Sequence, residues 1–326
     1  MKTVFIINPK AGKEKDIKML TRDIYDTADF LKADVECYVT KCQGDAVKFV
    51  KEYLKTNGCA RFISCGGDGT LNEVLNGCIG EPGAQVGVMP MGTGNDFVRN
   101  FDSGCDFLNI AAQILGETEK CDAIRYQTSF NGEEKAGYCV NMFNIGFDCN
   151  VADTKGKIIE KSFIAGPLAY FAAIILMLIK KKGAKLKIEL DGNEKYKGSL
   201  LLCSIANGSF CGGGIKSNPM AHLRDGLMDV NIIHNISRLN FISKLPFYMK
   251  GTHVKLRGIE RIIENHSCKK AALTPLDGSM RLCIDGEIID ASLCEFETEK
   301  NAFNLVIPRI EETDILEKDA EKICCK

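Results

Sequence analysis

The feature that most constrains the fold is an alternation of strand-like and helix-like segments over the first 125 residues. The apolar runs of strand length are residues 3–7, 35–39, 60–65 and 85–90. Apolar residues at helical spacing predict helices over residues 14–32, 46–54, around 71–75, and from the end of the segment 91–96 to about 115. Such alternation predicts an α/β fold with a parallel sheet covered by helices on both faces.

After about residue 125 the pattern changes to strand-like runs separated by polar turns. The pairs typical of two-residue β-hairpin turns are Asn131-Gly132, Asp191-Gly192, Asp277-Gly278 and Asp285-Gly286. We therefore predict a second, mainly antiparallel β domain that also holds helices near 163–179 and 238–250. The predicted boundaries are 1–124 plus about 304–326 for the α/β domain, and 125–303 for the β-rich domain.

Composition argues against several classes of protein. The formal net charge of −1 gives no basis for binding nucleic acid. The 16 cysteines include no CxxC pair, and with only 4 histidines the chain offers no spacing suited to zinc. Met1-Lys2 leads into an apolar segment too short for a secretory signal. We therefore expect a cytoplasmic protein whose thiols are reduced, many of them packed as small core residues.

The stretch 163–182 combines an uncharged apolar run with three terminal lysines. The run is at the short limit for a membrane span, and Gly166-Pro167 interrupts it. We interpret residues 168–179 as a buried or interfacial helix. The lysines that cluster here are Lys180, Lys181, Lys182, Lys185 and Lys187. They predict either a solvated helix end or transient contact with anionic lipid at the inner face of the membrane.

Three loops rich in glycine and small residues follow the predicted strands: NPKAGK (8–13), GGDGT (66–70) and MGTGND (91–96). Ligands of open α/β sheets bind beyond the carboxyl ends of the strands. Glycine lets the backbone approach an anion, and a following helix offers free N–H groups to phosphate. One such loop is more often a tight connection, and none matches a Walker loop or GxGxxG. Together the three predict a nucleotide phosphate site.

Acidic residues stand beside two of these glycine-rich turns, at Asp68 and Asp96. A carboxylate repels phosphate unless a cation lies between them. Magnesium held by carboxylates and phosphate oxygens is the usual arrangement in phosphoryl transfer. Asp68 therefore favours a kinase site over nucleotide storage.

The motifs NPKAG, GGDGTLNEVLNG and PMGTGNDF, in this order and spacing, resemble the diacylglycerol kinase catalytic family of bacterial lipid kinases. Sphingosine kinases and, more distantly, NAD kinases share its architecture. The resemblance continues through GPLAY, ANGSFCGGG, HLRDGLMDV and CIDGE, so it covers nearly the whole chain. It implies an N-terminal nucleotide-binding α/β domain and a C-terminal β-sandwich-like domain, with the last strand returning to the first domain.

The resemblance also implies an ATP site with magnesium. The residues that would line it are Asn8, Pro9, Lys10, Ala11, Gly12, Thr40, Gly66, Gly67, Asp68, Gly69, Thr70, Leu71, Asn72, Glu73, Thr93 and Asp96. Asp68 would hold the catalytic Mg²⁺ or its water shell, and Asp96 would support the nucleotide loop.

Two further sites follow from the same resemblance. Glu287 would act as the general base on the lipid hydroxyl. The backbone carbonyls of His222 and Leu227 and the carboxylate of Asp225 would form a structural magnesium site, which Asp122 would join through water.

The residues alone also allow plainer interpretations. Asp285-Gly286 predicts a type I′ hairpin turn, which would leave Glu287 as a surface strand residue. Glu73, in the first turns of the helix after GGDGT, suits the helix dipole.

The resemblance implies an ATP-dependent kinase that phosphorylates a lipid hydroxyl, with diacylglycerol or a related lipid as acceptor. An NAD kinase-like nucleotide kinase and a catalytically silent lipid- or nucleotide-binding homologue remain alternatives. The sequence leaves the acceptor and the oligomeric state open.

Overall fold

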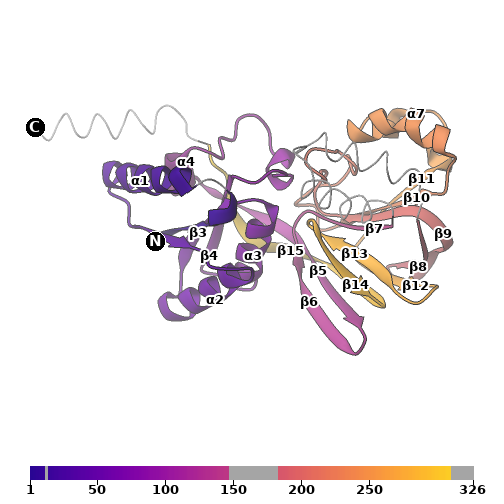
Figure 1. Ribbon diagram of the computed structural model, residues 1–326, viewed down its shortest axis with the longest axis horizontal. Coiled ribbons are helices and arrows are strands. Elements are labelled where there is room, and N and C mark those ends of the chain that lie inside the picture. Colours follow the sequence, from indigo (N-terminus) through magenta and orange to yellow (C-terminus); the bar gives the residue numbers. More distant parts are fainter. Residues whose placement is uncertain (12–13, 147–182, 310–326) are drawn as a thin grey trace, which may run out of the picture. The chain divides into compact units, whose positions relative to one another are not determined.

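The computed structural model describes residues 1–11, 14–146 and 183–309 (Figure 1). These residues form two compact units. Unit 1 contains Met1–Gly92, Phe101–Lys120 and the described residues from Phe303 onward. Unit 2 contains Thr93–Asn100 and the described residues of Cys121–Ala302. The short segment Thr93–Asn100 groups with unit 2 because its polar side chains bond to the backbone there, as shown below.

Unit 1 is built on a parallel sheet in which four strands lie in the order β2, β1, β3, β4. Their bounds are Thr3–Ile7 for β1, Val35–Val39 for β2, Ala60–Gly66 for β3 and Ala84–Pro90 for β4. Every residue of β1 and β3 is buried, which explains why both read as continuous apolar runs. The predicted parallel α/β sheet is confirmed.

The last strand among the described residues extends this sheet. Strand β15 (Leu293–Val306) pairs in parallel with β4, with Asn304 opposite Gln85. The first part of the same strand pairs with β12 (Lys270–Pro275) in unit 2. The return of the last strand to the first domain, which the family resemblance implied, is therefore present.

Helices flank the sheet of unit 1. Their bounds are Glu14–Leu31 for α1, Asp45–Asn57 for α2, Asp68–Cys78 for α3 and Ile110–Leu115 for α4. Helix α2 packs on α3 and α1 contacts α4; Figure 1 shows α1 and α4 on one side of β3 and β4, with α2 on the other. After the third glycine-rich loop the structure has two short helices, η2 (Phe97–Asn100) and α4, in place of one helix to about residue 115.

Unit 2 is a mainly antiparallel β structure, as predicted. Its further strands are β5 (Thr118–Phe130), β6 (Glu133–Cys139), β7 (Met142–Gly146), β8 (Ala184–Leu190), β9 (Asn193–Ala206), β10 (Met228–His234), β11 (Ile263–Cys268), β13 (Met280–Ile284) and β14 (Glu287–Ala291). Strand β9 pairs antiparallel with β7, β8 and β10. Phe143 and Phe296 pack edge to face at the centre of the core, with ring centroids 4.8 Å apart. The predicted second helix is α7 (Arg238–Met249), which the single turns η3 (His253–Lys255) and η4 (Ile259–Arg261) follow.

Three of the four predicted hairpin turns form. Asn131-Gly132, Asp191-Gly192 and Asp285-Gly286 all have positive φ at both positions and connect paired strands. Asp277-Gly278 was wrong as a hairpin, because it joins β12 to β13 and these strands pair with other partners. Asp277 lacks a positive φ, and its carboxylate forms an ion pair with Lys185 Nζ at 2.7 Å.

The cysteines behave as core residues in the described part of the chain. All of those described there are free thiols, and most are buried. Burial raises the pKa of Cys203 and of Cys268 to about 12, so these thiols stay protonated at neutral pH. They act as small apolar side chains.

The predicted apolar helix 163–179, with Lys180, Lys181 and Lys182, lies outside the described residues. Of the same basic cluster, Lys187 is described, and it forms an ion pair with Glu189 at 3.0 Å. Among the helices of the described ranges, none has both the length and the apolar character needed to cross a bilayer.

Candidate functional site

The carboxyl ends of β1, β3 and β4 meet at one edge of the sheet in unit 1. Strands β3 and β4 are in register up to Gly66 and Pro90. The N–H of Met91 donates to the carbonyl of Gly66 at 2.8 Å, and that of Asn8 donates to the carbonyl of Cys65 at 3.0 Å. The loops that follow these three strands therefore start together, as the sequence predicted.

The GGDGT loop needs its first two glycines for space. A Cβ at Gly66 would lie 2.4 Å from Thr70 Oγ1, and one at Gly67 would lie 3.3 Å from Gly92 Cα. The chain then enters α3 directly at Asp68, which is half-buried. The first N–H groups of a helix have no partner within the helix, so this turn can receive phosphate oxygens.

Asn8 connects the first two glycine-rich loops. Its side-chain Nδ2 donates to Thr70 Oγ1 at 2.9 Å, while its Oδ1 accepts from the N–H of Lys10 at 2.9 Å. Pro9, Lys10 and Ala11 form the turn η1. Gly12, which the sequence placed in the same site, lies outside the described residues. The structure therefore brings the NPKAG and GGDGT motifs together.

Glu73 adds the loop after β2 to this arrangement. Its carboxylate accepts from the N–H of Gly44 at 2.8 Å and from that of Ala46 at 3.3 Å. Gly44, the N-cap residue of α2, has no side chain that could accept a hydrogen bond from the helix. The Glu73 carboxylate, from the neighbouring helix, is the acceptor at this N-terminus instead. Thr40, at the start of the loop, is buried and donates from its N–H to the carbonyl of Ile7 at 2.9 Å. Glu73 thus holds the backbone of the Thr40 loop, whatever else it contacts.

Glu73→Ala is expected to lower the free energy of unfolding by about 1 kcal/mol, because the N-terminus of α2 loses its capping acceptor. If the Thr40 loop contacts ATP, KM for ATP should also rise roughly fivefold, equivalent to about 1 kcal/mol of binding, with kcat little changed. Chemical denaturation and initial rates measure the two effects. Glu52→Ala, at an exposed position of α2, is the matched control. An unchanged midpoint of unfolding would show that the cap is dispensable.

The third loop is anchored within unit 2. Asp96 is buried, and its carboxylate accepts from the N–H groups of Gly213 (2.8 Å) and Gly214 (2.7 Å). Arg99 Nε lies 3.7 Å from the same carboxylate, and its Nη2 donates to the carbonyl of Gly94 at 3.2 Å. Asp96 therefore holds its own loop to the glycine run of ANGSFCGGG. Thr93 is exposed in this loop.

Asp122 and the loop His222–Leu227 come together in unit 2. Asp122 is fully buried, its N–H donates to the carbonyl of Leu223 at 2.8 Å, and its carboxylate accepts from Gly226 N–H and Asn301 N–H, both at 2.7 Å. Asp225 is exposed and caps its own turn by accepting from the N–H of Leu227 at 3.0 Å.

The donors of this loop suit a hard cation. They are backbone carbonyls and one exposed carboxylate, the oxygen ligands that Mg²⁺ and Ca²⁺ prefer. The negative charge of Asp225 also contributes, after burial, to raising the pKa of neighbouring Asp229. A cation at this turn would offset that repulsion. In the described parts of the chain, no group of three or more acidic, His or Cys side chains forms a metal site, so a cation here would depend on main-chain oxygens.

Asp122→Ala is expected to lower the free energy of unfolding by about 2–4 kcal/mol, because the buried N–H of Gly226 and the part-buried N–H of Asn301 both lose their acceptor. Urea unfolding followed by circular dichroism measures the change. Asp290→Ala, at an exposed strand position, should stay within about 0.5 kcal/mol of the parent protein. Equal effects in the two variants would contradict the anchoring role of Asp122.

Glu287 follows the Asp285-Gly286 turn and is exposed at the start of β14. Asp285 has φ 44° and Gly286 φ 101°, which fits the predicted type I′ turn. The Asp285 carboxylate accepts from the N–H of Met142 at 2.9 Å and from Cys139 Sγ at 3.2 Å. The turn that precedes Glu287 is therefore hydrogen-bonded to β7, and this bond holds the backbone next to Glu287 in place.

Several asparagines in this region were not singled out from the sequence. Asn100 Oδ1 accepts from the N–H of Ser209 at 2.7 Å, and Asn141 Nδ2 donates to the carbonyl of Phe210 at 2.6 Å. Asn207 Nδ2 donates to the carbonyl of Asp122 at 2.9 Å. They hold ANGSFCGGG beside the Asp96 and Asp122 loops. Their partners are distant in sequence, so no local pattern marks them.

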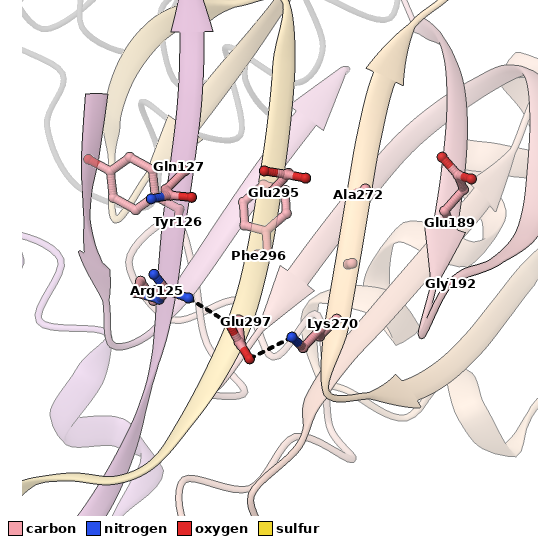
Figure 2. Close-up of a pocket in the computed structure, with 11 residues that line it drawn as sticks. Arg125, Tyr126, Gln127, Glu189, Gly192, Lys270, Ala272, Glu295, Phe296 and Glu297 are labelled. Carbon is pink, nitrogen blue, oxygen red and sulfur yellow. Dashed lines mark hydrogen bonds and ion pairs between the residues drawn. The ribbon is translucent and has the colours of Figure 1, made fainter. Parts of the chain in front are cut away.

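A polar pocket of about 420 Å³ lies over strands β5, β8, β12 and β15 of unit 2 (Figure 2). Glu297 stands between Arg125 and Lys270 and forms ion pairs with both, at 2.5 and 2.9 Å. None of the predicted site residues lines it. Both cationic side chains of the pocket, Arg125 and Lys270, are already paired with Glu297, and we assign the pocket no ligand.

Comparisons with known proteins agree with the motifs. Residues 2–126 match the family described as the diacylglycerol kinase catalytic domain. Residues 141–307 match the family described as the YegS C-terminal NAD kinase β-sandwich-like domain. The two matches leave only a short segment between them.

The chain is also similar to curated proteins over most of its length. It is 30% identical to a diacylglycerol kinase of Staphylococcus carnosus, covering 96% of this chain and 98% of that protein. It is 33% identical to a diacylglycerol kinase of Staphylococcus aureus (strain Newman), covering 77% of this chain and 76% of that protein. A crystal structure of a putative diacylglycerol kinase from Bacillus anthracis shares the fold, with a TM-score of 0.69 and 22% sequence identity. The similarity covers 94% of this chain and 96% of that one.

Proposed function

Because this chain belongs to the diacylglycerol kinase family and is a kinase-type transferase, we propose that it transfers the γ-phosphoryl group of ATP to a lipid hydroxyl. Diacylglycerol or a closely related lipid is the proposed acceptor. The observation that carries the donor half of the proposal is the joined arrangement of NPKAG and GGDGT, in which Asn8 bonds Thr70 and Asp68 opens helix α3.

The donor site would use the loops of unit 1. The segment Gly66 to Asn72 would wrap the phosphates, with the N–H groups at the start of α3 as donors, and the Thr40 loop would contact the nucleotide. Asp68 would hold Mg²⁺ directly or through its water shell. That ion, when bound, neutralises charge on the phosphoryl oxygens during in-line transfer.

The acceptor chemistry would use Glu287. A carboxylate suits a general base because it can take the hydroxyl proton as the oxygen attacks phosphorus. The attachment of the turn through Asp285 supports this role, since a base must be held in position to work. The loop His222–Leu227 with Asp225 and Asp122 would hold a second, structural magnesium.

The test is incubation of the full chain with γ-labelled ATP and Mg²⁺, separately with diacylglycerol, other glycerolipids, a sphingoid base, a polyprenol and NAD. Label should enter a lipid, with diacylglycerol the best substrate, and only in the presence of a divalent cation. Label in NAD would instead establish a nucleotide kinase. Tight ATP binding with no labelled acceptor would point to a silent homologue, and both results would overturn the proposal.

A further inference from the structure

Helix α7 of unit 2 has apolar residues on two opposite sides. The inner side packs against β10 and β11 in the hydrophobic core of this part of the unit. The residues of α7 that pack there are Phe241, Leu245, Tyr248 and Met249. Figure 1 shows α7 at the outside of unit 2, next to those strands. This inner face already accounts for the attachment of the helix.

The outer side is apolar as well, although it faces solvent. Leu239 is 82% exposed, Ile242 52% and Phe247 43%. With Ser243 and Pro246, both exposed, they occupy positions i, i+3, i+4, i+7 and i+8, which form a single stripe. A surface helix normally presents polar residues on this side. A contiguous exposed apolar stripe indicates an interaction surface.

Basic side chains are concentrated in the segment that contains and follows this stripe. Lys250 follows the last turn of α7, and Lys244 lies within the helix. Turn η3 contacts α7 and η4, and the exposed basic residues of this segment are Lys255, Arg257 and Arg261. The acidic side chain between residues 239 and 261 is Glu260. The chain as a whole has a net charge of −1, so this surface is locally basic.

From these two features we infer that the outer face of α7 docks on an anionic lipid surface, with Leu239, Ile242 and Phe247 entering the boundary between headgroups and acyl chains. Leu and Phe on one side of a helix and Lys or Arg around it are the pattern of helices that lie in the membrane interface. Each basic residue near an anionic leaflet adds attraction.

A second copy of the chain fits this surface less well. In a two-fold symmetric pair, the same patch faces itself. The basic side chains near the stripe, Lys250 and Arg257 among them, would then lie close to those of the other copy, which is repulsive. An anionic bilayer can bury the apolar stripe and attract the neighbouring basic side chains at the same time.

Docking through α7 is independent of which lipid accepts phosphate. It adds to the proposed function a surface that would bring a lipid kinase to its substrate. Binding to vesicles without ATP tests it alone, so its failure is distinguishable from failure of the kinase proposal. If the chain binds vesicles but phosphorylates no lipid, the docking inference stands and the proposed kinase activity is wrong.

The experiment is co-sedimentation of the full chain with phosphatidylcholine vesicles, with and without phosphatidylglycerol. The parent protein should bind the anionic vesicles and lose affinity as salt is added. The double variant Leu239→Ser/Phe247→Ser should bind at least about tenfold more weakly, because two large apolar side chains leave the interface. The variant Lys250→Glu/Arg257→Glu should lose a similar factor, and only on anionic vesicles.

Matched controls lie in unit 1. Leu108→Ser removes another exposed apolar side chain, and Lys51→Glu/Lys55→Glu makes the same charge change on α2. Both should bind vesicles as the parent does. Activity on an acceptor dispersed in detergent should be the same in all these variants, which separates docking from catalysis.

Four outcomes would overturn the inference. The first is parent-like vesicle binding by Leu239→Ser/Phe247→Ser, and the second is equal binding of the parent protein to neutral and anionic vesicles. The third is a dimer that this double variant converts to a monomer, and the fourth is a large loss of thermal stability in the variant. The third would assign the stripe to a second copy. The fourth would mean that another part of the chain covers it.

Discussion

Asp68→Asn is expected to lower kcat by about three orders of magnitude without unfolding the protein. The substitution keeps the size of the side chain and removes its negative charge. If Asp68 binds Mg²⁺ next to the phosphates, the amide can no longer hold the cation where charge develops during transfer. The side chain is half-buried at the first position of α3, where an amide fits without a clash. Initial rates with saturating ATP and lipid measure the effect.

Comparing the changes in KM for ATP and in kcat separates an effect of Asp68→Asn on ATP binding from an effect on the chemical step. KM for ATP should change far less than kcat, and the thermal midpoint should stay close to that of the parent. Asp23→Asn, at an exposed position of α1, makes the same chemical change away from the glycine-rich loops and should be silent. Normal kcat in Asp68→Asn would remove Asp68 from the proposed metal site.

Glu287→Gln is expected to lower kcat by about 10²–10⁴-fold, the range of a general base. Glutamine has the same shape but cannot take a proton from the lipid hydroxyl. The residue is exposed at the start of β14, so loss of its charge should leave stability unchanged. Initial rates at saturating ATP and lipid measure the change in kcat, and thermal denaturation checks that stability is unchanged.

Asp290→Asn is the matched control on the same hairpin, because Asp290 is exposed on β14 as well. It should keep parent-like kcat and a parent-like thermal midpoint. If Glu287→Gln lowered stability and rate together, or if Asp290→Asn lost as much activity, the proton-acceptor role would be wrong.

Local chemistry made the strands and most turns predictable. Strands β1 and β3 are buried on both faces, so their apolar runs are unambiguous. Asn131-Gly132 turns in the predicted way because both residues accept positive φ without strain. Asp277-Gly278 is the same dipeptide as Asp191-Gly192 and Asp285-Gly286 but forms no hairpin, because the strands on either side of it pair with distant strands. Dipeptide chemistry allows a hairpin; pairing of the strands decides whether it forms.

The roles of the acidic residues were harder to predict for the same reason. The carboxylates of Asp96 and Asp122 bond to backbone N–H groups more than a hundred positions away, at Gly213 and Gly226. The sequence shows that these residues are acidic, and it does not show which distant loop each will contact. Glu73 was predicted to suit the dipole of its own helix, and the structure adds that its carboxylate accepts from backbone N–H groups at the N-terminus of the neighbouring helix α2.

The pairing of β15 with β4 also bears on how the protein is made. The edge of β4 stays uncovered until β15, more than two hundred residues later in the sequence, has been synthesised. Until then the sheet of unit 1 is incomplete, with an open strand edge that can pair with other chains. A fragment that stops at Lys120 would expose the same edge permanently.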